Sequence, residues 1–330
     1  MKADFPLQTN ELLGHEAAWR LLAEAHARGE LTGSWLLAGP AGIGKATLAY
    51  MAAKKLLAGG DWSVASEAVD RPGKSNKINM IRQRTNPNLY ILERDFTKEE
   101  KKRIAASIEA GQPPATENAK RNESISVDDI NNIINKLSLK TPDGTPRVVV
   151  IDSGDDLNLN SANTLLKTLE EPPADTVIFM LTAASRALLP TIRSRCRLVR
   201  MAPLGDDIVY NYLKLQGKSD DEAALLAKLS HGSIGRALLL DRKEGVKLYS
   251  EIQYLATQKR YAGIAELTKK PDSDGIMPII IADIMADRAA NGDLSMANLW
   301  EKYLKKYEKS STYHLECGRL NALMLMEMAS

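Results

Sequence analysis

One short stretch near residue 40 constrains the fold of this chain more than any other. After an apolar, β-prone run at residues 34–38, the sequence reads Gly39-Pro40-Ala41-Gly42-Ile43-Gly44-Lys45, a glycine followed after four residues by Gly-Lys. Loops of this pattern aim backbone N–H groups and a helix N-terminus at a phosphate, and the lysine reaches the terminal phosphates. A helical pattern follows at residues 46–57, so the sequence predicts a strand, a phosphate loop and a helix.

The position after this lysine departs from the pattern. A Ser or Thr there would bind Mg²⁺ through its hydroxyl, but the chain has Ala46, so we expect an impaired Mg²⁺ site. Thr47 comes next, and because a helix turns by roughly 100° per residue, we expect its hydroxyl to point elsewhere. A slipped register that recruits Thr47 stays open as the alternative.

A second candidate motif ends at Asp152. The apolar run before it resembles the second ATPase motif, a strand that ends in an aspartate near Mg²⁺. Related ATPases place a glutamate next, to polarise the attacking water, whereas this chain has Ser153, whose hydroxyl is no general base at neutral pH. Asp155 and Asp156 stay open as replacements. With both parts missing, we expect the chain's own ATPase activity to be absent or weak.

Short β-prone runs alternate with helical patterns through the first two thirds of the chain. The runs lie at residues 34–38, 88–92, 147–151, 177–181 and 198–201. Residues 148–151 and 177–181 are apolar throughout, as expected for central strands buried on both faces. The alternation predicts an α/β fold with a parallel sheet covered by helices. After Pro203 helical periodicity takes over, so the C-terminal third is predicted to be all-helical.

Between the second and third runs, residues 93–123 are dense in charges of both signs and contain a Gly- and Pro-rich break at 111–114. We interpret this stretch as a mobile, solvated surface insertion. A helix is then predicted to begin after Ser126, because Asp129 lies three residues on, as in a capping box.

Composition excludes several classes of protein. The 330 residues carry 44 Lys+Arg against 42 Asp+Glu, a net charge of +2, which argues against a uniformly basic DNA-binding surface. Only Cys196 and Cys317 are present, too few for a disulfide framework or a four-thiolate zinc site, and the four histidines lack metal-ligand spacing. No run approaches the ~20 apolar residues of a spanning helix. We expect a cytoplasmic protein that holds no metal cluster, with Cys196 a small buried residue rather than a nucleophile.

Several motifs follow one another in an order that is specific. They are Leu13-Gly14-His15-Glu16, the helical stretch 160–171 that ends at Pro172-Pro173, the strand 177–182, Ser194-Arg195-Cys196, and Gly232-Ser233-Ile234-Gly235-Arg236-Ala237. Together they closely resemble the clamp-loader branch of the AAA+ ATPases. The resemblance implies an AAA+ nucleotide-binding domain over residues 1–202, a helical lid over 203–242 and a helical collar for oligomerisation over 243–330.

The resemblance also implies roles for single residues. Arg195 is expected to act in trans as an arginine finger that reaches the ATP of a neighbouring subunit and stabilises charge on the transferring phosphoryl group. The alternative is an arginine that pairs with Glu170 or Glu171 in its own domain, while Arg193 and Arg197 are weaker candidates. The residues predicted to contact nucleotide are Gly39, Gly42, Gly44, Lys45, Ala46, Thr47, Asp152, Thr182 at the first sensor and Arg236 at the second.

Two states stay open for the nucleotide pocket. Either ATP or ADP binds and Lys45 contacts its phosphates, or the pocket is a relic in which Lys45 pairs with Asp152. Subunits of this branch often carry a four-cysteine zinc module after the phosphate-loop helix, but residues 57–87 contain no cysteine. We therefore expect no zinc, with a basic, Asn-rich linker in place of the module.

Ala46 and Ser153 favour a non-motor subunit of the family. Such a subunit would hold a fixed place, like a stator, in a hetero-pentameric ring with the gamma/tau motor and the delta subunit. The ring loads a sliding clamp onto primed DNA for the DNA polymerase III holoenzyme, whose nucleotidyltransferase activity lies in another subunit. One alternative is a gamma/tau-type motor that recruits Thr47 and uses Asp155 or Asp156. A more distant alternative is a phosphate-loop regulator outside replication.

Overall fold

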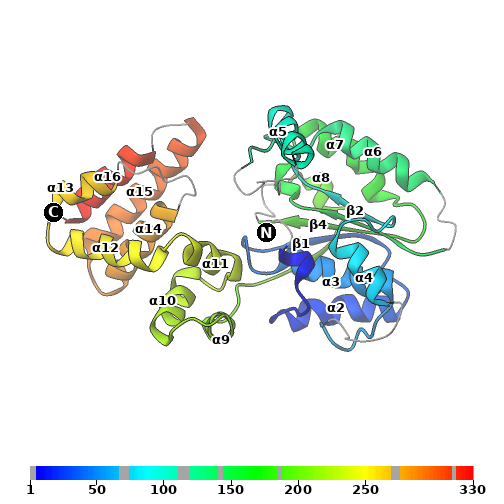
Figure 1. Cartoon of the computed structure of the whole chain (residues 1–330), viewed down its shortest axis with the longest axis horizontal. Coiled ribbons are helices and arrows are strands. Elements are labelled where there is room, and N and C mark those ends of the chain that lie inside the picture. The colour runs from blue at the N-terminus through cyan, green and yellow to red at the C-terminus, as the bar shows by residue number, and fades with distance from the viewer. Residues whose placement is uncertain are drawn as a thin grey trace. The chain divides into compact units, whose positions relative to one another are not determined.

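The computed structural model describes residues 5–66, 74–110, 119–139, 144–183, 188–268, 276–313 and 317–329. Internal contacts divide the chain into two compact units, Met1–Leu204 and Gly205–Ser330 (Figure 1). The first unit contains a sheet and the second is built from helices. The finer division of the helical part into a lid and a collar stays a prediction.

Five parallel strands form the sheet of the first unit, in the order β2-β3-β4-β1-β5. The strands are β1 (Gly33–Ala38), β2 (Leu89–Leu92), β3 (Arg147–Ile151), β4 (Thr176–Thr182) and β5 (Arg197–Arg200). All five predicted runs are therefore strands, and the parallel α/β architecture is confirmed. β3 and β4 are buried along their whole length, as their apolar runs predicted. Because parallel strands point the same way, their carboxyl ends meet at one edge of the sheet.

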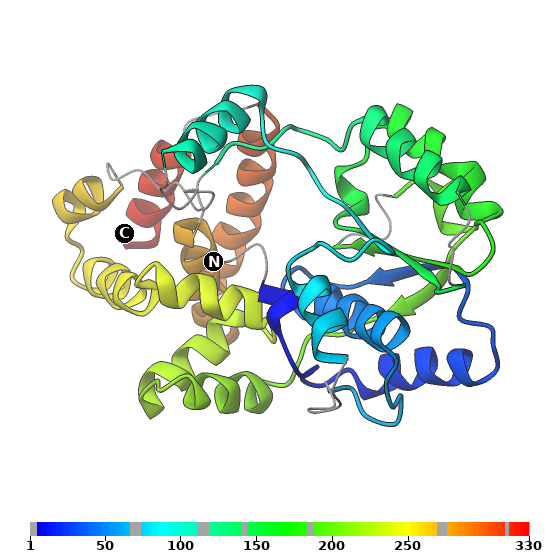
Figure 2. The ribbon, with the colours of Figure 1, turned by 45° about the vertical axis from the view of Figure 1, so that its right-hand side comes forward.

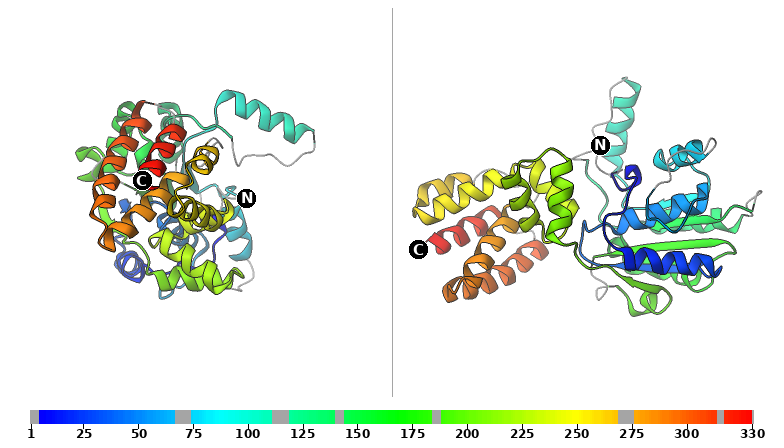
Figure 3. Two further views of the ribbon diagram at one scale, coloured as in Figure 1. Left: turned by 90° about the vertical axis from the view of Figure 1, so that its left-hand side faces the viewer. Right: turned by 90° about the horizontal axis from the view of Figure 1, so that it is seen from below.

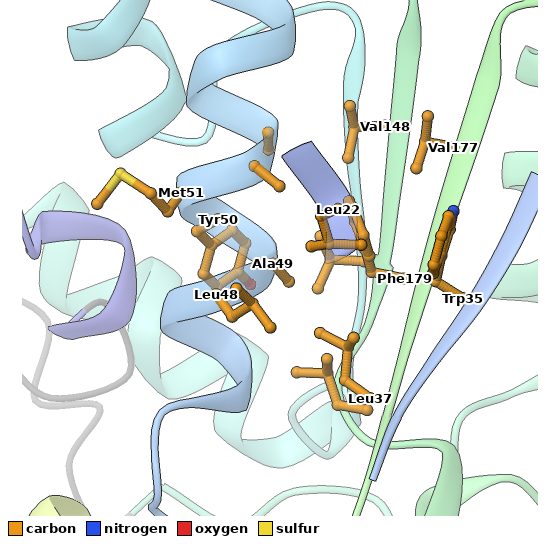
Figure 4. Close-up of a cluster of buried hydrophobic side chains, with 14 of the residues drawn as sticks. Leu22, Trp35, Leu37, Leu48, Ala49, Tyr50, Met51, Val148, Val177 and Phe179 are labelled. Atoms are coloured by element: carbon orange, nitrogen blue, oxygen red, sulfur yellow. The ribbon is translucent and has the colours of Figure 1, made fainter. Parts of the chain in front are cut away.

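Alternate residues of the strands belong to two different cores. Trp35, Leu37, Val150 and Phe179 belong to the core that packs against the helix after the phosphate loop. Figure 4 draws part of this core and labels Trp35, Leu37 and Phe179. Their chain neighbours Leu36, Val149, Ile151, Ile178 and Met180 pack on the opposite face. The sheet is thus covered by helices on both sides (Figure 2), and the period of two along each strand decides which core each residue enters.

The helices of the first unit are α1 (Phe5–Gln8), α2 (Glu16–Ala27), α3 (Lys45–Ala58), α4 (Lys74–Arg82), α5 (Lys98–Glu109), α6 (Val127–Ser138), α7 (Leu159–Glu170) and α8 (Pro190–Arg193). A 3₁₀ turn, η1 (Gly154–Asp156), follows β3. Side chains from α1 to α4 contribute to the first core, whereas α6, α7 and α8 contribute to the second. The predicted start of α6 is confirmed, because the Ser126 side chain accepts a hydrogen bond from the Asp129 N–H.

The charged stretch between β2 and β3 contains a helix that the sequence analysis did not assign. Helix α5 begins after Thr97, whose side chain accepts a hydrogen bond from the Glu100 N–H, and none of its residues is buried. It projects from the rest of the first unit in Figure 3. The predicted break at residues 111–114 lies outside the described residues.

The segment after α3 was predicted to be a basic linker, but part of it forms α4 and another part packs on α2. Trp62 stacks on Trp19 with ring centroids 5.1 Å apart and on His26 at 4.5 Å. The Trp19 indole N–H also donates to the Trp62 carbonyl at 2.9 Å. Aromatic stacking therefore holds this segment to α2; residues 67–73 lie outside the described part of the chain.

The second unit is helical throughout its described residues, as predicted. It consists of α9 (Asp206–Leu215), α10 (Asp220–Ser230), α11 (Ile234–Arg242), α12 (Gly245–Thr257), α13 (Tyr261–Leu267), α14 (Ile276–Ala290), α15 (Leu294–Tyr313) and α16 (Cys317–Ala329). Met324 and Met328 are buried and belong to the core of this unit. Of the helices described, none combines the length and apolarity that crossing a membrane requires.

Candidate functional site

The phosphate loop connects β1 to α3 and has a backbone that glycine permits. Gly44, immediately before α3, has φ of 114°, in the region that residues with a Cβ rarely adopt. A Cβ on Gly39 would lie 2.2 Å from the Met201 carbonyl oxygen, which is backbone and has little freedom to move. Gly42 also has a positive φ, of 75°. These predicted residues therefore allow the tight path of the loop between β1 and α3.

His15 supports this loop from the segment before α2. Its Nε2 lies 2.7 Å from the Ile43 carbonyl oxygen, a hydrogen bond across 28 residues of sequence. The ring also lies against the position where a Cβ on Gly44 would be, at 3.6 Å. The sequence analysis included His15 only as part of an opening motif and assigned it no contact, because nothing local in the sequence pairs it with Ile43.

Lys45 is turned back onto the loop that precedes it. Its Nζ donates to the carbonyl oxygens of Gly39 at 2.6 Å and Pro40 at 2.5 Å, and the residue is only 9% exposed. Burial lowers the pKa of Lys45, while the negative charges of Asp152 and Asp155 oppose that shift. Of the two states left open for Lys45, the direct pair with Asp152 is not the one found: the hydrogen bonds of this ammonium go to backbone carbonyls, and Asp152 acts on it only through space.

Ala46 and Thr47 form the first turn of α3. The Ala46 side chain is partly buried and packs against the first hydrophobic core, and Thr47 is also partly buried. Position 46 supplies no oxygen ligand, so the residues present do not fit the usual Mg²⁺ site of a phosphate loop.

Asp152 lies directly after β3, at the carboxyl edge of the sheet. Its N–H donates to the Leu92 carbonyl at 2.8 Å, which continues the pairing of β3 with β2. Burial raises the pKa of the Asp152 carboxyl and the charge of Glu93 raises it further, whereas Lys45 opposes the shift. The fold thus places Asp152 near the phosphate-loop lysine, as the two motifs predicted.

The two acids considered as replacements for the missing glutamate are both engaged. Asp155 accepts hydrogen bonds from the Thr182 hydroxyl at 2.5 Å, the Ala183 N–H at 2.6 Å and the Ser153 hydroxyl at 3.0 Å. Asp156 pairs with Arg94, whose Nε lies 3.2 Å away. Thr182, the predicted first-sensor residue, is fully buried, and its hydroxyl donates to Asp155. Asp155 joins the ends of β3 and β4.

Arg195 follows α8 and contacts the last residue of α7. Its Nε donates to Oε2 of Glu170 at 2.9 Å, its Nη2 lies 2.8 Å from the same oxygen in an ion pair, and its Nη1 donates to the Thr191 carbonyl at 3.0 Å. The side chain of Arg195 is 29% exposed and that of Glu170 is 58% exposed. The pair that the sequence analysis considered as the alternative is therefore present within this chain.

The neighbours of Arg195 have different surroundings. Arg197 donates to the Glu30 carbonyl at 2.7 Å and covers the Trp35 ring at 5.3 Å, so it belongs to the packing around β1. Arg193 is exposed on α8. Burial raises the pKa of the Cys196 thiol to about 12, so it stays protonated at neutral pH and is a poor nucleophile.

Arg236, the predicted second-sensor residue, lies on α11 in the second unit. Its Nη2 donates to Oδ2 of Asp283 on α14 at 2.7 Å. The other oxygen of Asp283 lies 2.7 Å from Nε2 of His231, which follows α10. Arg236 is 27% exposed and Asp283 12% exposed. One carboxylate therefore joins three helical segments of this unit through Arg236 and His231.

With this geometry described, comparison with known proteins decides the family. A family model described as DNA polymerase III, delta subunit, matches residues 14–205, which include the whole sheet, the phosphate loop and Arg195. The chain belongs to this family. The resemblance to the clamp-loader branch of the AAA+ ATPases, stated from the motifs, is thereby confirmed.

Individual members of the family are similar over part of their length. The delta' subunit of DNA polymerase III from Pseudomonas aeruginosa is 29% identical over 230 residues, 70% of this chain and 60% of that protein. The delta' subunit from Escherichia coli is 38% identical over 122 residues, 37% of this chain and 36% of that one. A gamma subunit from Buchnera aphidicola is 26% identical over 242 residues, 71% of this chain and 58% of that protein. The matched part is thus less than two thirds of each relative.

The family match includes some of the interacting residues described above and leaves others outside. Glu170, Asp155 and Lys45 are inside the matched range, whereas Arg236 and Asp283 are outside it. The sequence analysis considered Glu170 only as an alternative partner of Arg195 and did not mention Asp283. A carboxylate 47 residues from its arginine, as Asp283 is from Arg236, leaves no local pattern in the sequence.

Proposed function

We propose that this chain is a delta'-type subunit of the DNA polymerase III clamp loader that hydrolyses little or no ATP itself. In this role it donates Arg195 in trans to the ATP site of a neighbouring motor subunit. The observation that carries the proposal is the state of Lys45, whose ammonium is bound to the loop carbonyls of Gly39 and Pro40. A lysine held there has to leave two acceptors before it reaches a phosphate.

Two further features support a weak or absent ATPase activity. Position 46 lacks the hydroxyl that binds Mg²⁺ in motors, and position 153 lacks the carboxylate that polarises water. Asp155 is held by three hydrogen-bond donors and would have to release at least one of them before it could bind an attacking water. Binding of ATP or ADP without turnover is compatible with the proposal, because the glycines of the loop still permit its path between β1 and α3.

The partners proposed for this chain follow from its family. We propose a place in a hetero-pentameric ring with gamma/tau motor subunits and a delta subunit, a ring that opens a sliding clamp and closes it on primed DNA. Similarity to both delta' and gamma subunits supports such a place, because subunits of one ring share a fold. The near-neutral net charge of +2 suits a subunit that shares DNA contact with others.

A gamma/tau-type motor is the second candidate. It is favoured by the similarity to a gamma subunit over 71% of the chain, and by Asp155, whose negative charge acts on Lys45 and opposes the lowering of its pKa by burial. For this function Asp155 would have to exchange its hydrogen bonds with Thr182 and Ala183 for one with a water molecule.

The test is ATP hydrolysis by a ring reconstituted with motor subunits, delta subunit, clamp and primed DNA. An arginine in trans contributes ~10³–10⁵ in rate at the site it serves, so Arg195→Ala is expected to stop turnover there and abolish clamp loading. Lys45→Ala is expected to leave turnover nearly unchanged. Arg193→Ala, an exposed arginine two residues away, is the matched control.

The opposite pattern would contradict the proposal. If Lys45→Ala removes turnover while Arg195→Ala does not, the chain hydrolyses its own ATP and the motor function holds. If neither variant changes turnover and the chain does not assemble with the motor subunits, the phosphate-loop regulator is favoured instead.

A further inference from the structure

The contact between Arg195 and Glu170 uses only part of the guanidinium. Arginine has five N–H groups. Nε gives one to an oxygen of Glu170, and Nη1 gives one to the Thr191 carbonyl. Nη2 lies 2.8 Å from the same Glu170 oxygen in the ion pair. The guanidinium is therefore held by two hydrogen bonds and an ion pair, which leave N–H groups on both terminal nitrogens for an anion.

Glu170 is an unusual residue for the place that it occupies. It is the last residue of α7 and is followed by a second acid, Glu171. Negative charge at a helix C-terminus opposes the helix dipole, so the stability of α7 does not account for this carboxylate. A side chain that is 58% exposed also contributes little to stability through an ion pair. The pair is better explained by what it does to the orientation of Arg195.

An unrestrained arginine has many rotamers, and fixing one of them at the moment of reaction costs entropy. Here the Thr191 carbonyl, four residues before Arg195, and the Glu170 carboxylate bind the guanidinium from two different helices, α8 and α7. Because these two helices pack on each other, the position of the guanidinium is set by the fold of the first unit rather than by the side chain alone.

We infer that Glu170 is a positioning residue for Arg195: it holds the guanidinium so that the remaining N–H groups of its terminal nitrogens can bind phosphate oxygens of a neighbouring subunit's nucleotide. The inference rests on the proposed function in trans and adds the residue that orients the arginine. The two contacts are compatible, since the phosphate takes donors that Glu170 does not use. The pair therefore persists in the assembled ring and need not open.

The experiment compares Glu170→Ala and Glu170→Gln in the reconstituted ring. Glu170→Ala removes the restraint on one flexible side chain, which corresponds to a roughly two- to tenfold change in rate. The variant is therefore expected to lower kcat for ATP hydrolysis by that factor, with KM unchanged. Glu170→Gln keeps an oxygen that accepts the Nε hydrogen bond and is expected to retain at least about half of the activity. Glu171→Ala removes an exposed acid at the same helix end and is the matched control.

A double variant separates positioning from an independent effect. If Glu170 acts through Arg195, the variant Arg195→Ala/Glu170→Ala turns over no more slowly than Arg195→Ala alone. Thermal melting of the unassembled chain and its incorporation into the ring should be the same for wild type and Glu170→Gln, which excludes a folding defect as the cause.

Three outcomes would overturn the inference. In the first, Glu170→Ala has the same turnover as wild type. In the second, Glu170→Ala raises turnover, which would mean that Glu170 holds the arginine away from the nucleotide. In the third, the loss of turnover in Glu170→Ala adds to the loss in Arg195→Ala. These outcomes are distinct from failure of the proposed function, which is seen when Arg195→Ala itself leaves turnover unchanged; in that case Glu170 has no arginine in trans to position.

Discussion

Two arginines of this chain were expected to contact nucleotide, and each binds a carboxylate of its own unit in a different way. Arg195 pairs with Glu170, whose side chain is 58% exposed, at the surface of the first unit. Arg236 pairs with Asp283, which is 12% exposed and also binds His231, inside the second unit. The arginines themselves are equally exposed, at 29% and 27%, so the difference lies in their partners.

The hydration of the carboxylate therefore determines how much each arginine pair contributes to the stability of its unit. A buried carboxylate has lost its water and depends on its protein partners, so breaking such a pair is costly. An exposed carboxylate regains water when its partner leaves, so its pair contributes little. We therefore expect the Arg236 pair to be mainly structural and the Arg195 pair to be free for a functional role.

The strongest test of this difference removes the two carboxylates. Breaking a largely buried pair is expected to destabilise the second unit by about 2–4 kcal/mol in Asp283→Ala, because Arg236 and His231 lose their shared partner. Glu170→Ala should cost under about 1 kcal/mol. Hydrogen exchange of the amides in α11 and α14, compared with those in α7, measures each unit separately. Asp287→Ala is the control, because Asp287 lies on α14 with Asp283 and forms an exposed pair with Lys228 of α10. Equal losses for the Asp283 and Asp287 variants would contradict the expected difference.

The second test removes the arginines instead. Arg236→Ala is expected to lower the free energy of unfolding of the second unit by about 1–3 kcal/mol, because Asp283 loses one of its two partners where little water can replace it. Arg195→Ala should change the stability of the first unit by less than about 0.5 kcal/mol. The same exchange measurement applies, and a larger loss for Arg195→Ala than for Arg236→Ala would contradict the assignment of roles.

Salt is expected to weaken the two ion pairs to different extents. The coupling energy of Arg195 with Glu170, obtained from a double-mutant cycle on stability, is expected to be ~0.2–1 kcal/mol in low salt. It should disappear in 1 M NaCl, where the Debye length falls to about 3 Å. The coupling of Arg236 with Asp283 should persist in the same buffer. Similar salt dependence of the two couplings would indicate that both pairs are equally hydrated.

The smallest effect concerns a carboxylate that has no ion-pair partner at close range among the described residues, Asp152. Burial raises its pKa in the folded chain. The protonated carboxyl therefore contributes to the stability of the folded chain. This contribution is fully present below the ordinary pKa of an aspartate and is lost as the pH rises through the raised pKa. At pH 8 the ionised carboxylate is a cost, so Asp152→Asn is expected to stabilise the first unit by ~0.5 kcal/mol.

At pH 4 this gain should shrink, because the raised pKa favours protonation of the wild-type carboxyl in the folded chain. Urea unfolding at the two pH values measures the difference, with Asp155→Asn as the contrasting variant because Asp155 has three hydrogen-bond donors. A loss of stability in Asp152→Asn at pH 8 would show that Asp152 is held by partners, as Asp283 is.

Much of the architecture was determined by local patterns in the sequence. The five apolar runs became the five strands, the Ser126 cap began α6, and Gly39 to Lys45 formed the loop between β1 and α3. These features depend on residues close together in the chain, through side-chain period, backbone freedom and capping. Helix α5 was not recognised from the sequence, because a helix without a buried face has no apolar stripe to reveal it.

The partners of the site residues were decided only by the tertiary structure. Lys45 binds loop carbonyls rather than Asp152, Asp155 binds Thr182 across 27 residues, and Arg195 binds Glu170 across 25. Several acids near each position had the right charge, so charge alone could not choose among them. The choice depends on which strand ends and helix ends the fold brings within hydrogen-bond distance, and on how much water it leaves around each carboxylate.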